Sequence, residues 1–84
     1  MNSVIMRRIA VTAGYRPLAP GRLAGSFEIS AVPGNAAAVF FQGDDGSDVA
    51  WVPGEFHLFE GIDLARLSVR GTPGDAVTII GGTW

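Results

Sequence analysis

The 84-residue sequence contains no cysteine and no lysine. Without cysteine no disulfide can stiffen the chain, and metal sites built on thiolates are excluded. Six arginines are its only basic residues apart from one histidine, and they face eight acidic residues, so the formal net charge is −2. A protein that binds nucleic acid needs a basic face, so this charge balance argues against a nucleic-acid partner.

Charge and long apolar segments are also scarce. Charged residues make up 17% of the chain, against about 25% in an average soluble domain. The longest apolar run covers residues 36–41, far below the ~18–20 residues that cross a bilayer, so no membrane partner is expected. Arg7 and Arg8 follow the apolar residues of the amino end, the reverse of the order in a signal peptide, so export is not expected.

The size of the chain limits its core. We expect residues 1–84 to form a single β domain, and a domain of this size buries only about 60–65% of the surface of its unfolded chain. Hydrophobic residues make up 48% of the sequence, so part of the apolar surface has no interior to occupy. We therefore expect homo-oligomers or another partner that covers it.

Turn residues dominate what is present. Four of the five prolines are followed by glycine, in pairs at residues 20–21, 33–34, 53–54 and 73–74. Proline pre-sets φ for the first central position of a type II turn, and glycine supplies the positive φ of the second. The pairs therefore predict short strands joined by tight corners.

The apolar pattern predicts about seven strands. Residues 22–32 alternate best, because one face carries Leu23, Phe27, Ile29 and Ala31. Gly25 in the same row indicates a bulge or the close approach of another backbone. The predicted strands cover residues 4–13, 22–32, 37–42, 49–52, 55–60, 66–70 and 75–80. Residues 61–65 are expected to form a connection that can hold one helical turn, and residues 81–84 are expected to form a tail. This spacing predicts an all-β fold, either a compact antiparallel β-sandwich or a small barrel.

Residue types for catalysis are few. His57 is the only histidine, and nothing near the five serines resembles a nucleophile elbow. On a strand His57 lies beside Glu55 or Phe59, and we expect it to be an ordinary exposed or interface residue. We therefore expect that the protein is not an enzyme and binds no cofactor.

An acidic loop covers residues 43–48. Asp45-Gly46 is a strong hairpin signal, since both residues tolerate positive φ. Oxygens of Asp44, Asp45 and Asp48 are also ligands that Ca²⁺ prefers, although their spacing does not match an EF-hand. A plain turn and a calcium site are thus both open.

Several exposed side chains are candidate contacts. The alternation over 66–70 places Arg66 and Arg70 in one row, which either faces solvent or pairs with acidic groups of a neighbouring subunit. Trp51 is expected in the core, and Trp84 is expected to dock the carboxyl end. An exposed aromatic row formed by Trp51, Tyr15 and Phe56 would instead indicate a sugar-binding module.

Turn and strand motifs give the chain a family resemblance. They are Gly43-Asp44-Asp45-Gly46-Ser47, Val52-Pro53-Gly54-Glu55, Glu60-Gly61-Ile62-Asp63-Leu64, Leu67-Ser68-Val69-Arg70-Gly71 and the segment from Gly74 to Trp84. In this order, after an early arginine-containing strand, they resemble small virion proteins of tailed bacteriophages. The resemblance covers most of the chain after about Ile9.

The resemblance implies a non-enzymatic virion structural protein, a capsid decoration or minor capsid protein that binds and stabilises the shell. Its partners would be the major capsid protein or other virion subunits. Its location would be the capsid of the virion and, during assembly, the host cytoplasm. The expected contact residues are Arg7 and Arg8, whose strand can add to a neighbour's sheet edge, together with Arg66, Arg70 and Trp84. A carbohydrate- or receptor-binding module and a tail or neck component are the alternatives.

Overall fold

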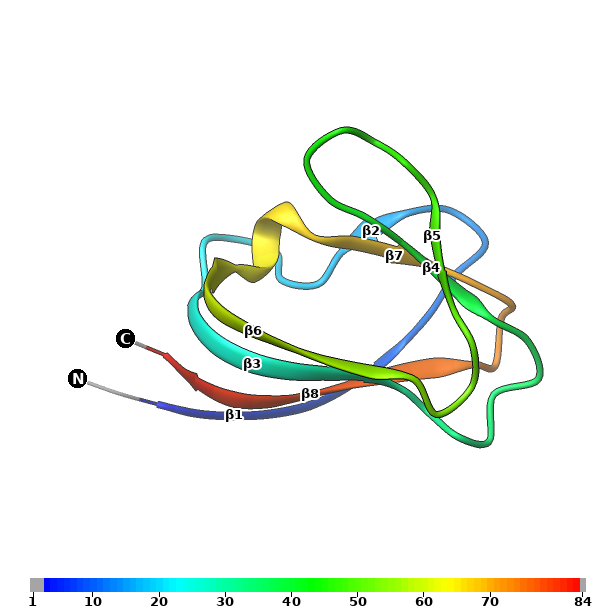
Figure 1. Cartoon of the computed structure of the whole chain (residues 1–84), viewed down its shortest axis with the longest axis horizontal. Coiled ribbons are helices and arrows are strands. Elements are labelled where there is room, and N and C mark those ends of the chain that lie inside the picture. The colour runs from blue at the N-terminus through cyan, green and yellow to red at the C-terminus, as the bar shows by residue number, and fades with distance from the viewer. Residues whose placement is uncertain (1–2, 84) are drawn as a thin grey trace.

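The protein folds as two antiparallel four-stranded sheets packed against each other (Figure 1). The structure, a computed structural model, describes residues 3–83. The elements are β1 (Val4–Ala10), β2 (Arg16–Pro17), β3 (Ala24–Ala31), β4 (Val39–Gln42), β5 (Val49–Trp51), β6 (Phe56–Asp63), the 3-10 helix η1 (Leu64–Arg66), β7 (Ser68–Arg70) and β8 (Ala76–Thr83). The long sheet has the order β1-β8-β3-β6, and the short sheet has the order β2-β7-β4-β5. The predicted all-β class is confirmed, and the architecture is a small sandwich.

The core lies between the two sheets and follows the predicted alternation. In β3 the buried residues Phe27, Ile29 and Ala31 alternate with partly exposed ones. From the short sheet Val39, Phe41, Trp51 and Val69 pack against them. Trp51 is 4% exposed, as expected, and its ring lies 3.9 Å from that of Phe41, measured between centroids.

The corners follow the turn prediction only in part. Gly54 and Gly74 have φ of 88° and 101°, the conformation that their Pro-Gly pairs predict, and Gly46 in the acidic loop has φ of 77°. Gly21 and Gly34 do not have positive φ, so the type II prediction is wrong at those two corners. A type II turn needs positive φ at its third residue, and there the chain turns by another route.

Gly25 lies where β3 approaches β8, and the predicted close approach is confirmed. A Cβ atom at Gly25 would lie 2.1 Å from the carbonyl oxygen of Gly82. Across the same pair of strands, a Cβ atom at Gly81 would lie 2.1 Å from the carbonyl oxygen of Ser26. The pairing of β3 with β6 also shifts register between Gly25 and Phe27, so this end of the sheet is locally irregular.

Several predicted boundaries are wrong. The strands β6 and β8 continue through residues 61–63 and 81–83, where the sequence predicts a connection and a tail. Both segments find hydrogen-bonding partners there, because Ala24 and Gly25 face Asp63 and Ile62, and β8 lies between β1 and β3. The first strand ends at Ala10, and the sequence pattern does not predict the two-residue β2.

The helical turn lies later than predicted, at η1. Asp63 precedes it, and one oxygen of its carboxylate accepts the N–H groups of Ala65 and Leu23, each at 3.0 Å. These hydrogen bonds lower the pKa of Asp63, with Leu23 the larger cause. Arg66 therefore ends a 3-10 turn, and the predicted strand over 66–70 begins only at Ser68. In residues 3–83 there is no helix of the length and apolarity needed to cross a membrane.

Candidate interaction surface

The outer face of the long sheet carries a row of exposed apolar side chains. Strand register aligns Met6 of β1, Ile80 of β8, Glu28 of β3 and Leu58 of β6. Met6, Ile80 and Leu58 are 71%, 51% and 73% exposed. Val4 and Phe56 lie on the same two edge strands and are also exposed. Apolar side chains therefore extend from one edge to the other of the face that the core does not use.

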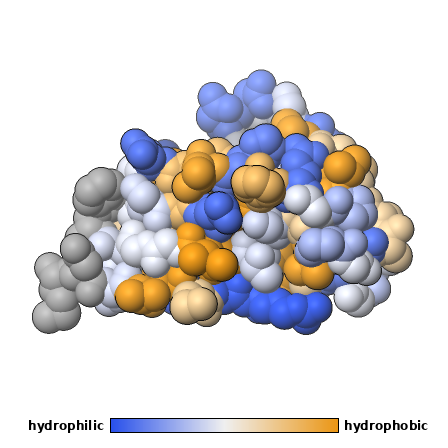
Figure 2. Space-filling model, turned by 60° about the horizontal axis from the view of Figure 1, so that its bottom comes forward, coloured by the Kyte–Doolittle hydropathy of each residue, from blue (hydrophilic) through white to orange (hydrophobic). Residues whose placement is uncertain are grey.

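Polar groups interrupt this apolar face. Glu28 lies within the row, and the next row aligns Arg8, Thr78 and Ser30 with Phe56. Figure 2, which brings the underside of the Figure 1 view forward, shows apolar groups separated by polar ones. A mixed surface of this kind is typical of interfaces that also spend time in water.

The two edges of the long sheet carry opposite charge. The β1 edge carries Arg7 and Arg8, and both are exposed. The β6 edge carries Glu60 and is preceded by Glu55. Neither strand has a second neighbour among the described residues, so each leaves a row of backbone N–H and C=O groups available for another strand.

His57 lies on the β6 edge, beside Glu55 as predicted. Its Nε2 atom lies 2.7 Å from Oε2 of Glu55, and its ring meets that of Trp51 edge-on at 4.7 Å between centroids. The other oxygen of Glu55 accepts the N–H group of Val52 at 3.1 Å. The hydrogen bond with His57, followed by that from Val52, lowers the pKa of Glu55.

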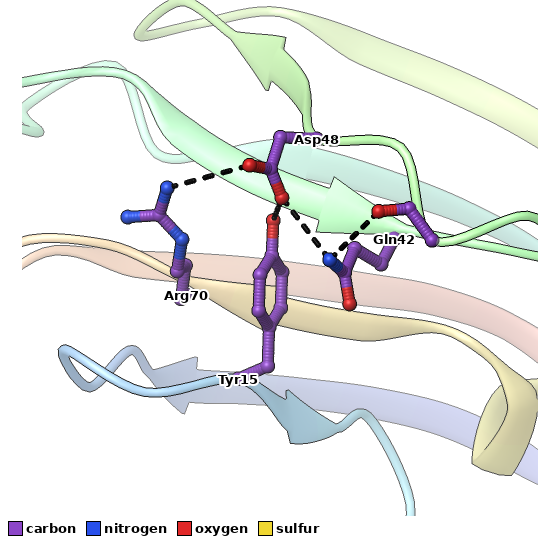
Figure 3. Close-up of polar contacts among 5 residues, drawn as sticks. Tyr15, Gln42, Asp48 and Arg70 are labelled. Atoms are coloured by element: carbon purple, nitrogen blue, oxygen red, sulfur yellow. Dashed lines mark hydrogen bonds and ion pairs between the residues drawn. The ribbon is translucent and has the colours of Figure 1, made fainter.

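Arg70 belongs to a polar cluster on the short sheet (Figure 3), and its acidic partner is in the same chain. Its Nη2 atom lies 3.9 Å from Oδ2 of Asp48, and its guanidinium lies over the ring of Phe40 at 4.5 Å. The Tyr15 hydroxyl donates to Oδ1 of Asp48 at 2.5 Å, and the Gln42 amide donates to the same oxygen at 3.1 Å. The cluster therefore ties the acidic loop to β4, β7 and the segment before β2.

This cluster shifts two pKa values. The Tyr15 hydroxyl bond is the largest cause that lowers the pKa of Asp48. Partial burial, followed by the bond to Asp48, raises the pKa of Tyr15. Asp48 thus stays ionised as the acceptor of the cluster. The guanidinium of Arg70 already contacts Asp48 and Phe40 of its own chain, so it is less available to bind another subunit.

The acidic loop is held by its own hydrogen bonds. Asp45 accepts the N–H group of Ser47 at 2.9 Å, and Gly46 accepts from Gln42 at 2.9 Å. Asp48 turns towards Tyr15 and Arg70. Over residues 3–83 no group of three or more histidine, aspartate or glutamate side chains is placed to hold a metal ion.

The predicted site residues do not come together. Arg7 and Arg8 lie on the β1 edge, Arg70 lies on the short sheet, and Trp84 lies outside the described residues. The predicted row of Arg66 and Arg70 on one strand is wrong, because Arg66 belongs to η1 and only Arg70 to β7. Arg66 borders an apolar hollow of about 260 Å³ that is lined by Phe59, Ile62, Asp63 and Leu67.

Sequence reasoning missed the apolar row and weighed an aromatic row that does not form. Trp51 is buried, Tyr15 is held by Asp48, and Phe56 lies on a strand of the other sheet. Met6, Leu58 and Ile80 do not stand out in the sequence, because the register that aligns them joins strands far apart in the chain. The sequence feature that could have identified them is that each occupies an outward-facing position in a segment of alternating polarity.

Comparisons with protein-family models, with curated protein sequences and with solved structures returned no match.

Proposed function

We propose that the protein is a non-enzymatic structural component of a bacteriophage particle, a decoration or minor capsid protein that binds the shell. The apolar row on the outer face of the long sheet is the observation that carries this proposal. Met6, Ile80 and Leu58 lie in register on one surface and are at least half exposed. Such a surface is stabilised when a partner covers it, by about 25 cal/mol for each Å² of apolar area removed from water.

The shell would be stabilised by mass action. A ligand that binds only the assembled shell lowers its free energy by RT ln(1 + [L]/Kd) per site, and joined copies add avidity. Glu28 and Arg8 lie among the apolar side chains and would fix the orientation of the bound copy. Like-charge contacts would reject other orientations.

Co-sedimentation with assembled shells of the phage that carries the gene tests the proposal. We expect the wild type to pellet with the shells and Ile80→Asp to lose most of that binding. Val49→Asp is the matched control, because Val49 is 52% exposed against 51% for Ile80, but lies on the edge of the short sheet. Equal binding by the two variants, or a wild type that stays in the supernatant, would contradict the proposal.

The same assay separates heads from tails. A decoration protein pellets with purified heads at many copies per particle, whereas a tail or neck component pellets with tails at few copies. Binding to tails alone would place the protein in that alternative class.

A further inference from the structure

We propose that copies of this chain join head to tail, with β1 of one copy adding to β6 of the next. These are the two open edges of the long sheet. The joint would continue the sheet from one copy into the next, so the apolar outer faces would lie on the same side. It concerns the edges of the sheet, and it does not depend on what the outer face binds.

Strand direction permits this joint. Along the long sheet β1, β8, β3 and β6 are each antiparallel to their neighbours, so β1 and β6 run in opposite directions. A second copy in the same orientation therefore presents its β6 antiparallel to β1. The joint needs only the first half of β1 and the residues at the start of β6, which lie opposite each other when the two copies are offset along the strands.

The hydrogen-bonding phase of both edges can be derived from bonds at the strand ends. The N–H group of Val11 donates to Asp75, and Ser3 accepts from Thr83, so odd-numbered residues bond β1 to β8. In β6, Glu55 accepts from Ala31. Because backbone groups alternate in direction, Val4 and Met6 on β1 point theirs away from the sheet, and so do Phe56 and Leu58 on β6.

One register satisfies charge and polarity together. It places Val4 opposite Leu58 and Met6 opposite Phe56 of the next copy, and it sets Arg7 opposite Glu55. All four apolar side chains are exposed in a single copy, and aliphatic and aromatic pairs of this kind stabilise antiparallel strands.

The neighbouring registers that keep the same hydrogen-bonding phase lack the pairing of Arg7 with Glu55. A shift of two residues in one direction sets Val4 opposite Glu60 and Arg7 opposite His57. A shift of two in the other direction sets Met6 and Arg7 opposite Gly54 and Pro53, which precede β6.

Charge also selects head-to-tail joining over joining of like edges. A joint between two β1 edges would gather Arg7 and Arg8 of both copies, and a joint between two β6 edges would gather Glu55 and Glu60 of both copies, so each would concentrate charge of one sign. Like charges on facing strands are destabilising. A joint between unlike edges builds a ring if the rotation closes and a filament if it does not.

Two proline variants test the joint by sedimentation velocity. Met6→Pro and Leu58→Pro each remove an outward N–H group, which the isolated fold does not use, from an edge strand where proline is tolerated. We expect the wild type to form a ring or filament and each variant alone to be a monomer. An equal mixture should form a 1:1 dimer, because each variant keeps the edge that the other has lost.

The two variants distinguish head-to-tail joining from the pairing of like edges. If Leu58→Pro still self-associates, β1 edges pair with each other, and if Met6→Pro does, β6 edges pair. Either result overturns the proposal, and so does a wild type that remains monomeric at its solubility limit or a mixture that forms no dimer.

Charge reversal gives a second test that avoids proline. Arg7→Glu and Glu55→Arg are each expected to weaken association about tenfold or more, and the two changes in one chain should restore it. Arg16→Glu is the matched control, because Arg16 is exposed on the short sheet. Glu55 also contacts His57 and Val52, so circular dichroism of each variant is used to confirm folding. Failure of the double variant to recover would contradict the proposed register.

Discussion

Replacing Gly81 with alanine is expected to destabilise the domain by about 2–3 kcal/mol, the upper part of the range of about 1–3 kcal/mol for overpacking a filled site. The added Cβ would lie 2.1 Å from the Ser26 carbonyl oxygen and 2.8 Å from the Cα atom of Phe27. Ordinary van der Waals contact begins near 3.4 Å. Both neighbours are backbone atoms of β3, so the strands must separate by about 1 Å and lose core packing with their hydrogen bonds.

Alanine substitutions at Gly43 and Gly71 provide controls for the loss of stability expected at Gly81. A Cβ atom added at Gly43 would have nothing within 4 Å, and Gly43 does not have positive φ, so Gly43→Ala should be neutral or stabilising by up to about 1 kcal/mol. At Gly71 the Cβ would meet the Val11 side chain at 2.9 Å and the Val39 side chain at 3.1 Å. Side chains can adjust, so Gly71→Ala should fall between the two.

Thermal unfolding followed by circular dichroism measures the difference. For a domain of this size, about 2–3 kcal/mol lowers Tm by about 10–20 °C. The comparison is made at one low protein concentration, because association raises Tm through mass action. A Tm for Gly81→Ala within about 3 °C of that for Gly43→Ala would refute the reasoning.

Two further predictions concern the side chains of Asp75 and Asp63. Asp75 is 6% exposed and accepts the N–H groups of Ala36 and Ala37 at 2.9 and 3.2 Å, so Asp75→Ala should cost about 2–4 kcal/mol in urea unfolding. Asp75→Asn keeps one acceptor and should cost about half as much; equal costs would contradict this account. The pKa of Asp63 is lowered on folding, so its stabilisation is full above its unfolded value of 3.8 and is lost as the pH falls through the lower, folded pKa. The difference in unfolding free energy between wild type and Asp63→Asn should therefore shrink from about pH 5 to about pH 2, and a constant difference would exclude this role.

Local chemistry made part of the fold predictable from the sequence. The alternation over Phe27, Ile29 and Ala31 assigned the buried face of β3, because side chains on a strand point to opposite faces in turn. The Pro-Gly pairs ending at Gly54 and Gly74 located two corners, because glycine adopts positive φ without steric cost. Gly25 marked a close backbone approach before its neighbour was known.

The residues of the candidate interaction surface were harder to predict from the local sequence pattern. Arg7 and Arg8 could be assigned to an edge strand from the sequence, and the structure places both on β1 at the end of the long sheet. Arg66 and Arg70 were grouped by alternation alone, and the grouping failed because the Asp63 carboxylate caps η1 between β6 and β7. A side-chain cap formed with a segment forty residues away, at Leu23, leaves no local pattern.

The sequence by itself determined the all-β class, the corners at Gly54 and Gly74 and the inward face of β3, because propensity and alternation act between residues close in the chain. The tertiary structure alone decided which strands became neighbours. Pairing of β1 with β8 brings Met6 beside Ile80, and pairing of β3 with β6 brings Leu58 into the same row. It also left β1 and β6, with their opposite charges, at the two open edges. Register between distant strands depends on how the whole core packs, so both the apolar face and the complementary edges emerge only when the chain is folded.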